Sequence, residues 1–287
     1  MGGDIPVAYI ISHDGDRLDI SLIEIDRVLP HEETIPEMLQ SLTERIRSDL
    51  LQKAPIIVER DNLVVLDGMH RLEALRRLTC RFICICLVDY NSPEIVVDRW
   101  CRTVSRPFSI EDASDLAEKL GLKISERQCC GSEAEKNLPL MIFSGTSKLL
   151  MGSSQEVSSS FRAVLKFEKA LRERGNKIGY ETEKRAMAML REESIDTVIC
   201  PPQIDKEQVI ESAIKGRTFI FKSTRHIIPA RPMAVNVPLS LLKDDSLSIE
   251  AANEKLSEML RGRSLRHLQP GSSWNGRRYE EDLYIFV

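Results

Sequence analysis

A short polar run follows the apolar segment LVVLD (63–67), and its residue types suit phosphate binding. A strand that turns directly into a helix leaves the first helical amides without intrahelical partners, and the helix dipole adds partial positive charge there. A glycine permits close approach of a ligand, an arginine offers a planar fork for phosphate oxygens, and a histidine can donate another hydrogen bond. The run consists of Asp67, Gly68, Met69, His70 and Arg71.

The same run has a second interpretation, in which Asp67 caps a helix and two polar side chains face solvent. It is not a Walker A loop, because the glycine spacing and the Lys-Ser/Thr pair are missing. The five residues alone leave the phosphate site and the capped helix equally open.

A carboxylate is expected close to this turn. Glu32 lies in PHEET (30–34), after an expected strand and before a helical pattern that begins at Pro36. Beside bound phosphate, a carboxylate can accept the proton of an attacking hydroxyl. Acidic residues are also common at helix starts, so a purely structural role is the alternative.

These residues need a framework of strands and helices, and the apolar spacing predicts two α/β (α+β) domains. The first domain, 1–105, is expected to contain strands at 5–11, 18–25, 55–59, 63–67 and 82–88, with helices after Pro36 and at 69–78. The second domain, 106–287, would face it across a cleft. Its expected helices are 109–121, 155–175, 181–193, 205–214 and 248–261; its expected strands are 139–143, 196–200, 217–221 and 282–287, with a loop at 122–137.

Composition narrows the class of protein. The chain has 287 residues, 42% of them hydrophobic, and a net charge of −4, which is less basic than expected for a protein that coats nucleic acid. No apolar run approaches the ~20 residues that span a bilayer, and the first residues do not resemble a secretory signal, so a cytoplasmic location is expected. The seven cysteines are irregularly spaced and are interpreted as buried thiols, without a metal site.

The segment 261–278 is the most basic part of the chain, with five arginines and no acidic residue. It could contact phosphate or nucleic acid. It could equally be a solvated loop, and its composition favours the loop.

The polar run resembles the Asp-Gly-X-His-Arg signature of the ParB/sulfiredoxin-like superfamily, in which this turn binds nucleotide phosphates. Three further segments resemble the free serine kinases of that superfamily: His31-Glu32, Trp100, and Thr224-Arg225-His226 in FKSTRHIIP. The C-terminal part is similar to the kinase-type proteins of siderophore gene clusters, which make O-phosphoserine. Met69 stands where a sulfiredoxin needs its cysteine, and no clear helix-turn-helix of a partition protein is found.

The resemblance implies a ParB/sulfiredoxin-like nucleotide-binding domain and a kinase that phosphorylates the hydroxyl of free L-serine with ATP or ADP and Mg²⁺. Glu32 would be the general base, and Asp67 would orient the turn or help to place Mg²⁺. The phosphates would be held by Gly68, Met69, His70 and Arg71. Serine would be bound by Trp100, Ser223, Thr224, Arg225 and His226.

The alternative is a ParB-like, nucleotide- or ligand-responsive DNA-binding transcriptional regulator, although the negative net charge makes nucleic acid an unlikely partner. The sequence does not distinguish ATP from ADP as the donor or serine from threonine as the acceptor. It also does not reveal the oligomeric state or the downstream pathway.

Overall fold

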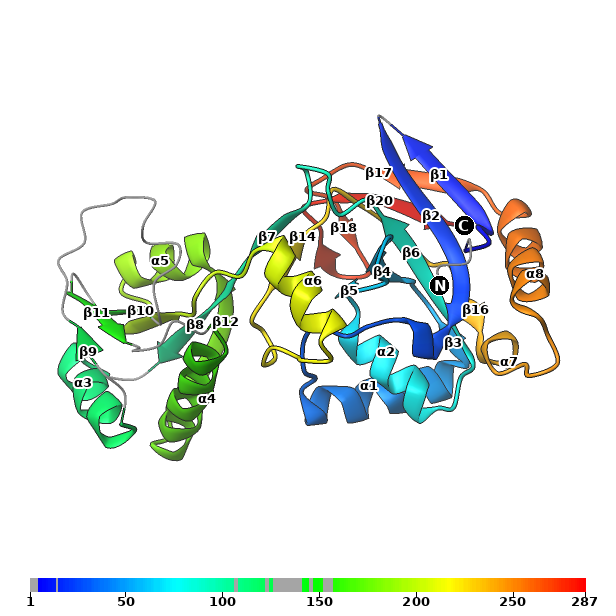
Figure 1. Ribbon diagram of the computed structural model, residues 1–287. Helices are drawn as coiled ribbons and strands as arrows, with labels where there is room; N and C mark the ends of the chain where they lie inside the picture. Colours follow the sequence, from blue (N-terminus) through cyan, green and yellow to red (C-terminus); the bar gives the residue numbers. More distant parts are fainter. Residues whose placement is uncertain are drawn as a thin grey trace. The chain divides into compact units, whose positions relative to one another are not determined.

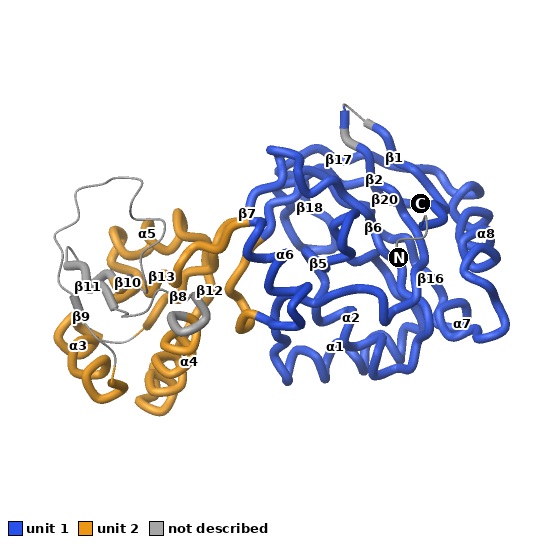
Figure 2. Tube along the Cα trace, viewed as in Figure 1, with its two compact units in different colours: residues 1–96, 206–218, 226–287 blue, residues 97–205, 219–225 orange. Residues whose placement is uncertain are grey.

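The computed structural model of the chain describes residues 5–13, 15–105, 108–121, 124–125, 141–144, 147–151 and 157–287 (Figure 1). The chain forms two compact units (Figure 2). Unit 1 contains 1–96, 206–218 and 226–287, and unit 2 contains 97–205 and 219–225. This division differs from the expected 1–105 and 106–287, because the C-terminal strands and the last long helix pack with the N-terminal sheet.

The centre of unit 1 is a five-stranded sheet with the order β1-β2-β6-β4-β5, in which only β4 and β6 are parallel. Every residue of β6 is buried, as expected for a continuous apolar strand at the middle of a sheet. The strands are β1 (Tyr9–His13), β2 (Asp16–Glu24), β4 (Ile56–Glu59), β5 (Val65–Asp67) and β6 (Phe82–Val88).

Two helices of unit 1 flank the polar run. Helix α1 (Pro36–Asp49) begins at a proline, which suits the first helical position, and packs against α2 (Met69–Arg77). Both helices confirm the sequence expectation. The other helices of unit 1 are the single-turn η1 (Ile25–Arg27), α6 (Lys206–Ile214), α7 (Leu239–Leu242) and α8 (Ile249–Arg261).

The C-terminal segment adds a second layer of strands to unit 1. In its three-stranded sheet, β20 (Asp282–Phe286) pairs parallel to β15 (Ala230–Met233) and antiparallel to β17 (Leu265–Leu268). Helix α8 packs on β2, where the buried Asn253 side chain bonds both the N–H and the carbonyl of Leu22. Short pairs are formed by β3 (Leu51–Gln52) with β16 (Val237–Pro238), and by β18 (Ser273–Trp274) with β19 (Arg277–Arg278).

Unit 2 contains a six-stranded sheet with the order β12-β8-β13-β10-β11-β9, and all of its pairs are antiparallel. Its strands are β8 (Trp100–Ser105), β9 (Ile124–Ser125), β10 (Met141–Ser144), β11 (Ser147–Met151), β12 (Lys177–Thr182) and β13 (Thr197–Cys200). Its helices are α3 (Ile110–Lys119), α4 (Val157–Glu173) and α5 (Glu183–Arg191). Ser109 and Asp112 form the expected capping box at α3.

The chain passes between the units four times: within β7 (Val96–Asp98), between residues 205 and 206, between residues 218 and 219, and within β14 (Arg225–Ile227). Most of the expected loop at 122–137, with Cys129 and Cys130, lies outside the described residues. The five described cysteines are free and buried, as expected. Within the described ranges, no helix is long and apolar enough to cross a bilayer.

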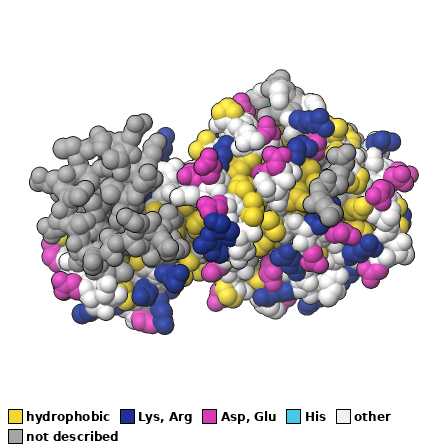
Figure 3. Space-filling model, in the orientation of Figure 1, with side chains coloured by type: hydrophobic (Ala, Val, Ile, Leu, Met, Phe, Trp, Pro, Cys, Tyr) yellow, Lys and Arg dark blue, Asp and Glu magenta, His cyan; other side chains and the backbone are white. Residues whose placement is uncertain are grey.

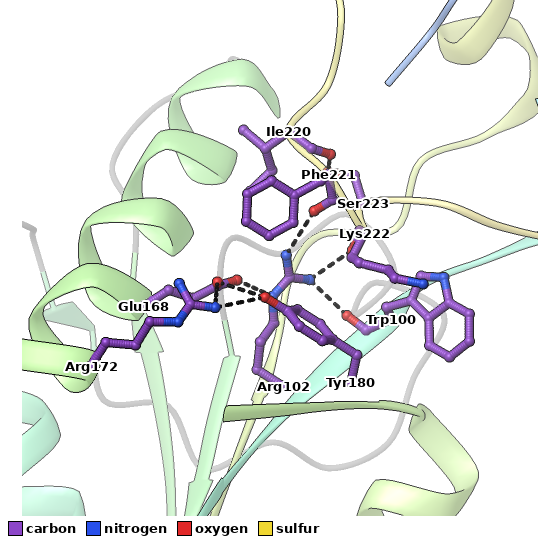
Figure 4. A network of polar contacts seen from close by, with 9 residues as sticks. All are labelled: Trp100, Arg102, Glu168, Arg172, Tyr180, Ile220, Phe221, Lys222 and Ser223. Carbon is purple, nitrogen blue, oxygen red and sulfur yellow. Dashed lines mark hydrogen bonds and ion pairs between the residues drawn. The ribbon is translucent and has the colours of Figure 1, made fainter. Parts of the chain in front are cut away.

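The strand predicted at 217–221 is wrong. The backbone carbonyls of Phe221 and Lys222 accept hydrogen bonds from the guanidinium of Arg102 and do not join a strand ladder (Figure 4). Arg102 is fully buried and also pairs with the buried Glu168 at 2.7 Å. A single buried arginine therefore determines the path of this segment, which periodicity does not reveal.

Candidate active site

The polar run forms the connection between β5 and α2. Gly68 is the N-cap of α2, with a φ of 112°, and no side chain caps the helix. The capped-helix interpretation is therefore excluded for Asp67. Its Oδ2 instead accepts from Arg71 at 3.2 Å and from Arg231 at 2.6 Å.

Glycine is required at position 68 for two reasons. Its positive φ is unfavourable for L-residues, and a Cβ there would lie 2.5 Å from Ile56 Cγ2. The turn therefore runs directly against β4, and the first amides of α2 emerge beside Asp67.

Arginine side chains surround the Asp67 carboxylate. Arg231 bridges Asp67 and Glu281, since its Nε lies 2.6 Å from Glu281 Oε1. Burial would raise the pKa of Asp67, but the nearby guanidinium groups of Arg231 and Arg71 outweigh it and hold this pKa well below its usual range. Asp67 is therefore ionised throughout the physiological pH range.

Part of the Arg71 guanidinium is engaged in hydrogen bonds within unit 1. Its guanidinium donates to the carbonyls of Ala54 and Pro55 as well as to Asp67. Only 23% of its side chain is exposed. It stabilises the turn, and any phosphate contact would use the remaining part of the guanidinium.

Two hydrogen bonds connect the loop that carries Glu32 to β5 and to the turn that follows it. His31 Nδ1 donates to the Val65 carbonyl at 2.6 Å, and the Ile35 amide donates to His70 Nε2 at 3.0 Å. The expected base and the expected phosphate turn are thus brought together within unit 1. His70 accepts through Nε2, so its neutral ring keeps the proton on Nδ1.

Two neutral histidines, His31 and His226, lie close to each other near β5. The rings of His31 and His226 meet edge to face with centroids 5.2 Å apart, and the Tyr90 hydroxyl is 2.8 Å from His226 Nε2. Burial lowers the pKa of His31 to about 4, despite the opposing effect of the bond to Val65. Burial and the neighbouring His31 also lower the pKa of His226.

Two cavities have residues of the turn in their walls. One, of about 370 Å³, is lined by Asp67 and Arg71 together with Arg231, Arg277 and Tyr279. The other, also about 370 Å³, contains Glu32 and Met69 in its wall. Glu32 and one residue of the turn, Met69, therefore line the same cavity.

The remaining expected site residues, apart from His226, belong to unit 2 and gather around Trp100. The Lys222 Nζ lies 4.5 Å from the centre of the Trp100 ring and the Arg225 guanidinium lies 5.7 Å from it. Arg225 also pairs with Asp98 at 3.4 Å. Ser223 is fully buried and its hydroxyl donates to the Ile220 carbonyl (Figure 4), so it shapes the segment.

Several functional candidates were not found from the sequence. Arg231 and Glu281 carry no motif: Arg231, on β15, contacts Asp67, and Glu281, which precedes β20, contacts Arg231. Tyr90 and Asp98 lie in unremarkable polar stretches. The arginine-rich composition of 261–278 was an available signal, but it did not single out Arg277 and was interpreted as a solvated loop.

The fold defines the class of protein. No family model matches the chain. A glutamate-to-alanine mutant of a free serine kinase, in complex with AMP, superposes with a TM-score of 0.69 and 20% identity over 84% of this chain and 97% of its own. SbnI from Staphylococcus aureus, with a C-terminal truncation, superposes with a TM-score of 0.68 and 19% identity over 85% and 96%. The chain has the ParB/sulfiredoxin-like fold in the form found in free serine kinase.

Sequence relatives narrow the class further. The chain is 29% identical over 237 residues to an ATP-dependent L-serine kinase of Staphylothermus marinus, covering 77% of this chain and 90% of the relative. It is 24% identical over 233 residues to the ADP-dependent L-serine kinase SerK of Thermococcus kodakarensis, covering 79% and 94%. The chain is a relative of the L-serine kinases along most of its length.

These relatives favour a kinase over the DNA-binding alternative. On the face drawn in Figure 3, basic and acidic side chains are interspersed among the described residues. The described part of that face shows no continuous basic stripe of the kind that typifies binding to the nucleic-acid backbone.

Proposed function

We propose that the chain is a kinase that phosphorylates free L-serine with ATP or ADP to give O-phospho-L-serine. The serine hydroxyl oxygen attacks the terminal phosphorus of the nucleotide, and its proton passes to the Glu32 carboxylate. The bond between that phosphorus and the bridging oxygen breaks, so that ADP or AMP leaves. Phosphoryl transfer depends mainly on positioning and charge stabilisation, which a prearranged turn can supply.

The double attachment of the Glu32 loop to the phosphate turn is the observation that carries this proposal. It holds a carboxylate beside a helix N-terminus, where a base and a phosphoryl group are both needed. The free serine kinase structures that share this fold include variants with one glutamate replaced, which fits a catalytic glutamate.

Mg²⁺ fits the carboxylate chemistry of the turn. Both arginine contacts of Asp67 are made through Oδ2, so Oδ1 can serve a cation. Mg²⁺ is commonly held by one or two carboxylates together with substrate phosphates. When bound, the ion would offset charge between the phosphates, and Asp67 is the residue that would hold it.

For the acceptor, we assign Trp100, Thr224, Arg225 and His226 as the residues that bind it. Arg225 would pair with the serine carboxylate, Thr224 and His226 would add hydrogen bonds, and Trp100 would form a wall. Ser223 would act indirectly, through the shape of the segment. The product is a precursor suited to amino-acid or siderophore biosynthesis, as the likeness to the siderophore-cluster kinases indicates.

Product formation tests the activity directly. The full chain is incubated with Mg²⁺, with ATP or ADP, and with a panel of free amino acids that includes threonine, and the products are identified by phosphorus NMR. We expect phosphoserine with at least one donor. The absence of any phospho-amino acid with either donor would refute the proposal.

Replacement of the base tests the mechanism. Glu32→Gln should lower kcat by roughly 10²- to 10⁴-fold, the usual contribution of a general base, while nucleotide binding is retained. Glu33→Gln is the matched control, because Glu33 lines the same cavity but is exposed. Equal activity of the two variants would remove Glu32 from the role of base.

A further inference from the structure

One arginine of the basic segment 261–278 reaches the cavity beside Asp67. The hairpin of β18 and β19 pairs Trp274 with Arg277 and Ser273 with Arg278. Arg277 lines the cavity of about 370 Å³, and its guanidinium lies 4.8 Å from the centre of the Tyr279 ring.

Two other arginines of the segment 261–278 make contacts with residues outside this cavity. Arg278 pairs with Glu280 at 3.1 Å, and both side chains are about 70% exposed. Arg263 donates to the carbonyls of Val235 and Phe286. Since adjacent strand residues point to opposite faces, the hairpin directs Arg277 and Arg278 to different surroundings.

The cavity has a surplus of positive charge. Five cationic side chains line it, against two carboxylates: Arg45, Lys53, Arg71, Arg231 and Arg277, with Asp49 and Asp67. Three of the cations are already paired, since Lys53 contacts Asp49 at 2.7 Å and both Arg71 and Arg231 contact Asp67. Arg277 forms no ion pair within the described part of the chain. Arg45 also forms none there, but Arg277 is the one that stacks on Tyr279 and interacts electrostatically with Asp67. An exposed guanidinium without a close ion-pair partner in a cationic cavity suits an anionic ligand.

We propose that Arg277 binds the phosphate chain of the donor nucleotide, so that the C-terminal hairpin is part of the nucleotide site. This inference rests on the proposed kinase function and adds a donor-binding residue to it. The planar fork of Arg277 can take two phosphate oxygens at once. Tyr279, beneath the guanidinium, would limit its conformations and hold the fork toward the cavity.

Equilibrium binding tests the assignment without relying on turnover. AMP, ADP and ATP are titrated by calorimetry, with Mg²⁺, into the wild type, Arg277→Ala, Arg277→Lys and Arg278→Ala. Arg277→Ala should weaken ADP and ATP by roughly 10- to 100-fold, the range for lost charge-assisted hydrogen bonds, and AMP by less. Arg277→Lys should fall between, because the charge is kept and the fork is lost. Arg278→Ala should bind like the wild type.

Two results would overturn the proposal. One is an Arg277→Ala variant that binds ADP and ATP as Arg278→Ala does. The other is an equal deficit for all three nucleotides, which indicates a structural role of Arg277. Wild-type chain that binds nucleotide but forms no phosphoserine would refute the kinase function and still leave the role of Arg277 decided by the binding series.

Discussion

Gly68→Ala should be among the most damaging single-methyl additions in unit 1. The backbone at Gly68 has a φ of 112°, and an added Cβ would lie 2.5 Å from Cγ2 and 2.9 Å from Cβ of Ile56. A left-handed backbone costs an L-residue roughly 1–2 kcal/mol, and overpacking against a buried side chain costs about 1–3 kcal/mol more. The expected loss in the free energy of unfolding is therefore about 2–5 kcal/mol.

Urea unfolding at equilibrium measures this loss, because a lower midpoint at an unchanged slope reports reduced stability. Gly216→Ala is the matched control. Gly216 has a φ of 64° but no atom within 4 Å of an added Cβ, so it should lose roughly 1–2 kcal/mol. Gly68→Ala should also lose nucleotide affinity, since the amides at the start of α2 would shift, whereas Gly216→Ala should keep it.

The contact with Ile56 can be tested separately. Ile56→Ala removes the atom that lies nearest to the added methyl. The Gly68→Ala/Ile56→Ala double variant should therefore lose less stability than the sum of the two single variants. Equal stability of Gly68→Ala and Gly216→Ala, with unchanged nucleotide binding, would refute the steric argument.

Two further predictions concern buried groups. Arg102→Leu should cost roughly 3–5 kcal/mol, because it leaves the buried Glu168 charge without Arg102, whereas Arg172→Leu should cost about 1 kcal/mol or less. Arg172 contacts the same carboxylate but is 49% exposed, so equal urea midpoints for the two variants would contradict this account. The free energy of unfolding should also fall as pH drops from 6.5 towards 4, because unfolded His31 binds a proton that the folded chain, with a His31 pKa of about 4, does not. The loss should reach about 3 kcal/mol, and His31→Gln should show a shallower decline; identical pH profiles would exclude His31 as its source.

The parts of the site that could be predicted from the sequence are local. The turn 67–71 follows from an apolar strand, a glycine and a helical pattern in direct succession, and the structure forms that arrangement. Helix α1 and the capping box at Ser109 were likewise predictable, because they depend on residues a few positions apart.

The other parts depend on residues far apart in the chain. Nothing near Asp67 in the sequence indicates that Arg231, 164 positions later, neutralises it. The apolar pattern at 217–221 suggested a strand, but Arg102 binds the carbonyl of its last residue, Phe221, and that of the next residue, Lys222. The apolar periodicity of a sequence indicates which side chains are buried. It does not indicate which backbone carbonyls will accept hydrogen bonds from a buried charged side chain instead of from a neighbouring strand.

The placement of Arg231 beside Asp67 has a consequence for the order of events during synthesis. The strands of the N-terminal sheet leave the ribosome well before β15, which carries Arg231 and lies 164 positions after Asp67. Contacts of such large sequence separation form late, because the intervening chain must first be ordered. A growing chain can thus fold its phosphate turn before the carboxylate at its edge has met Arg231. The strand that carries Arg231 thereby completes the electrostatic environment of a turn that was synthesised much earlier.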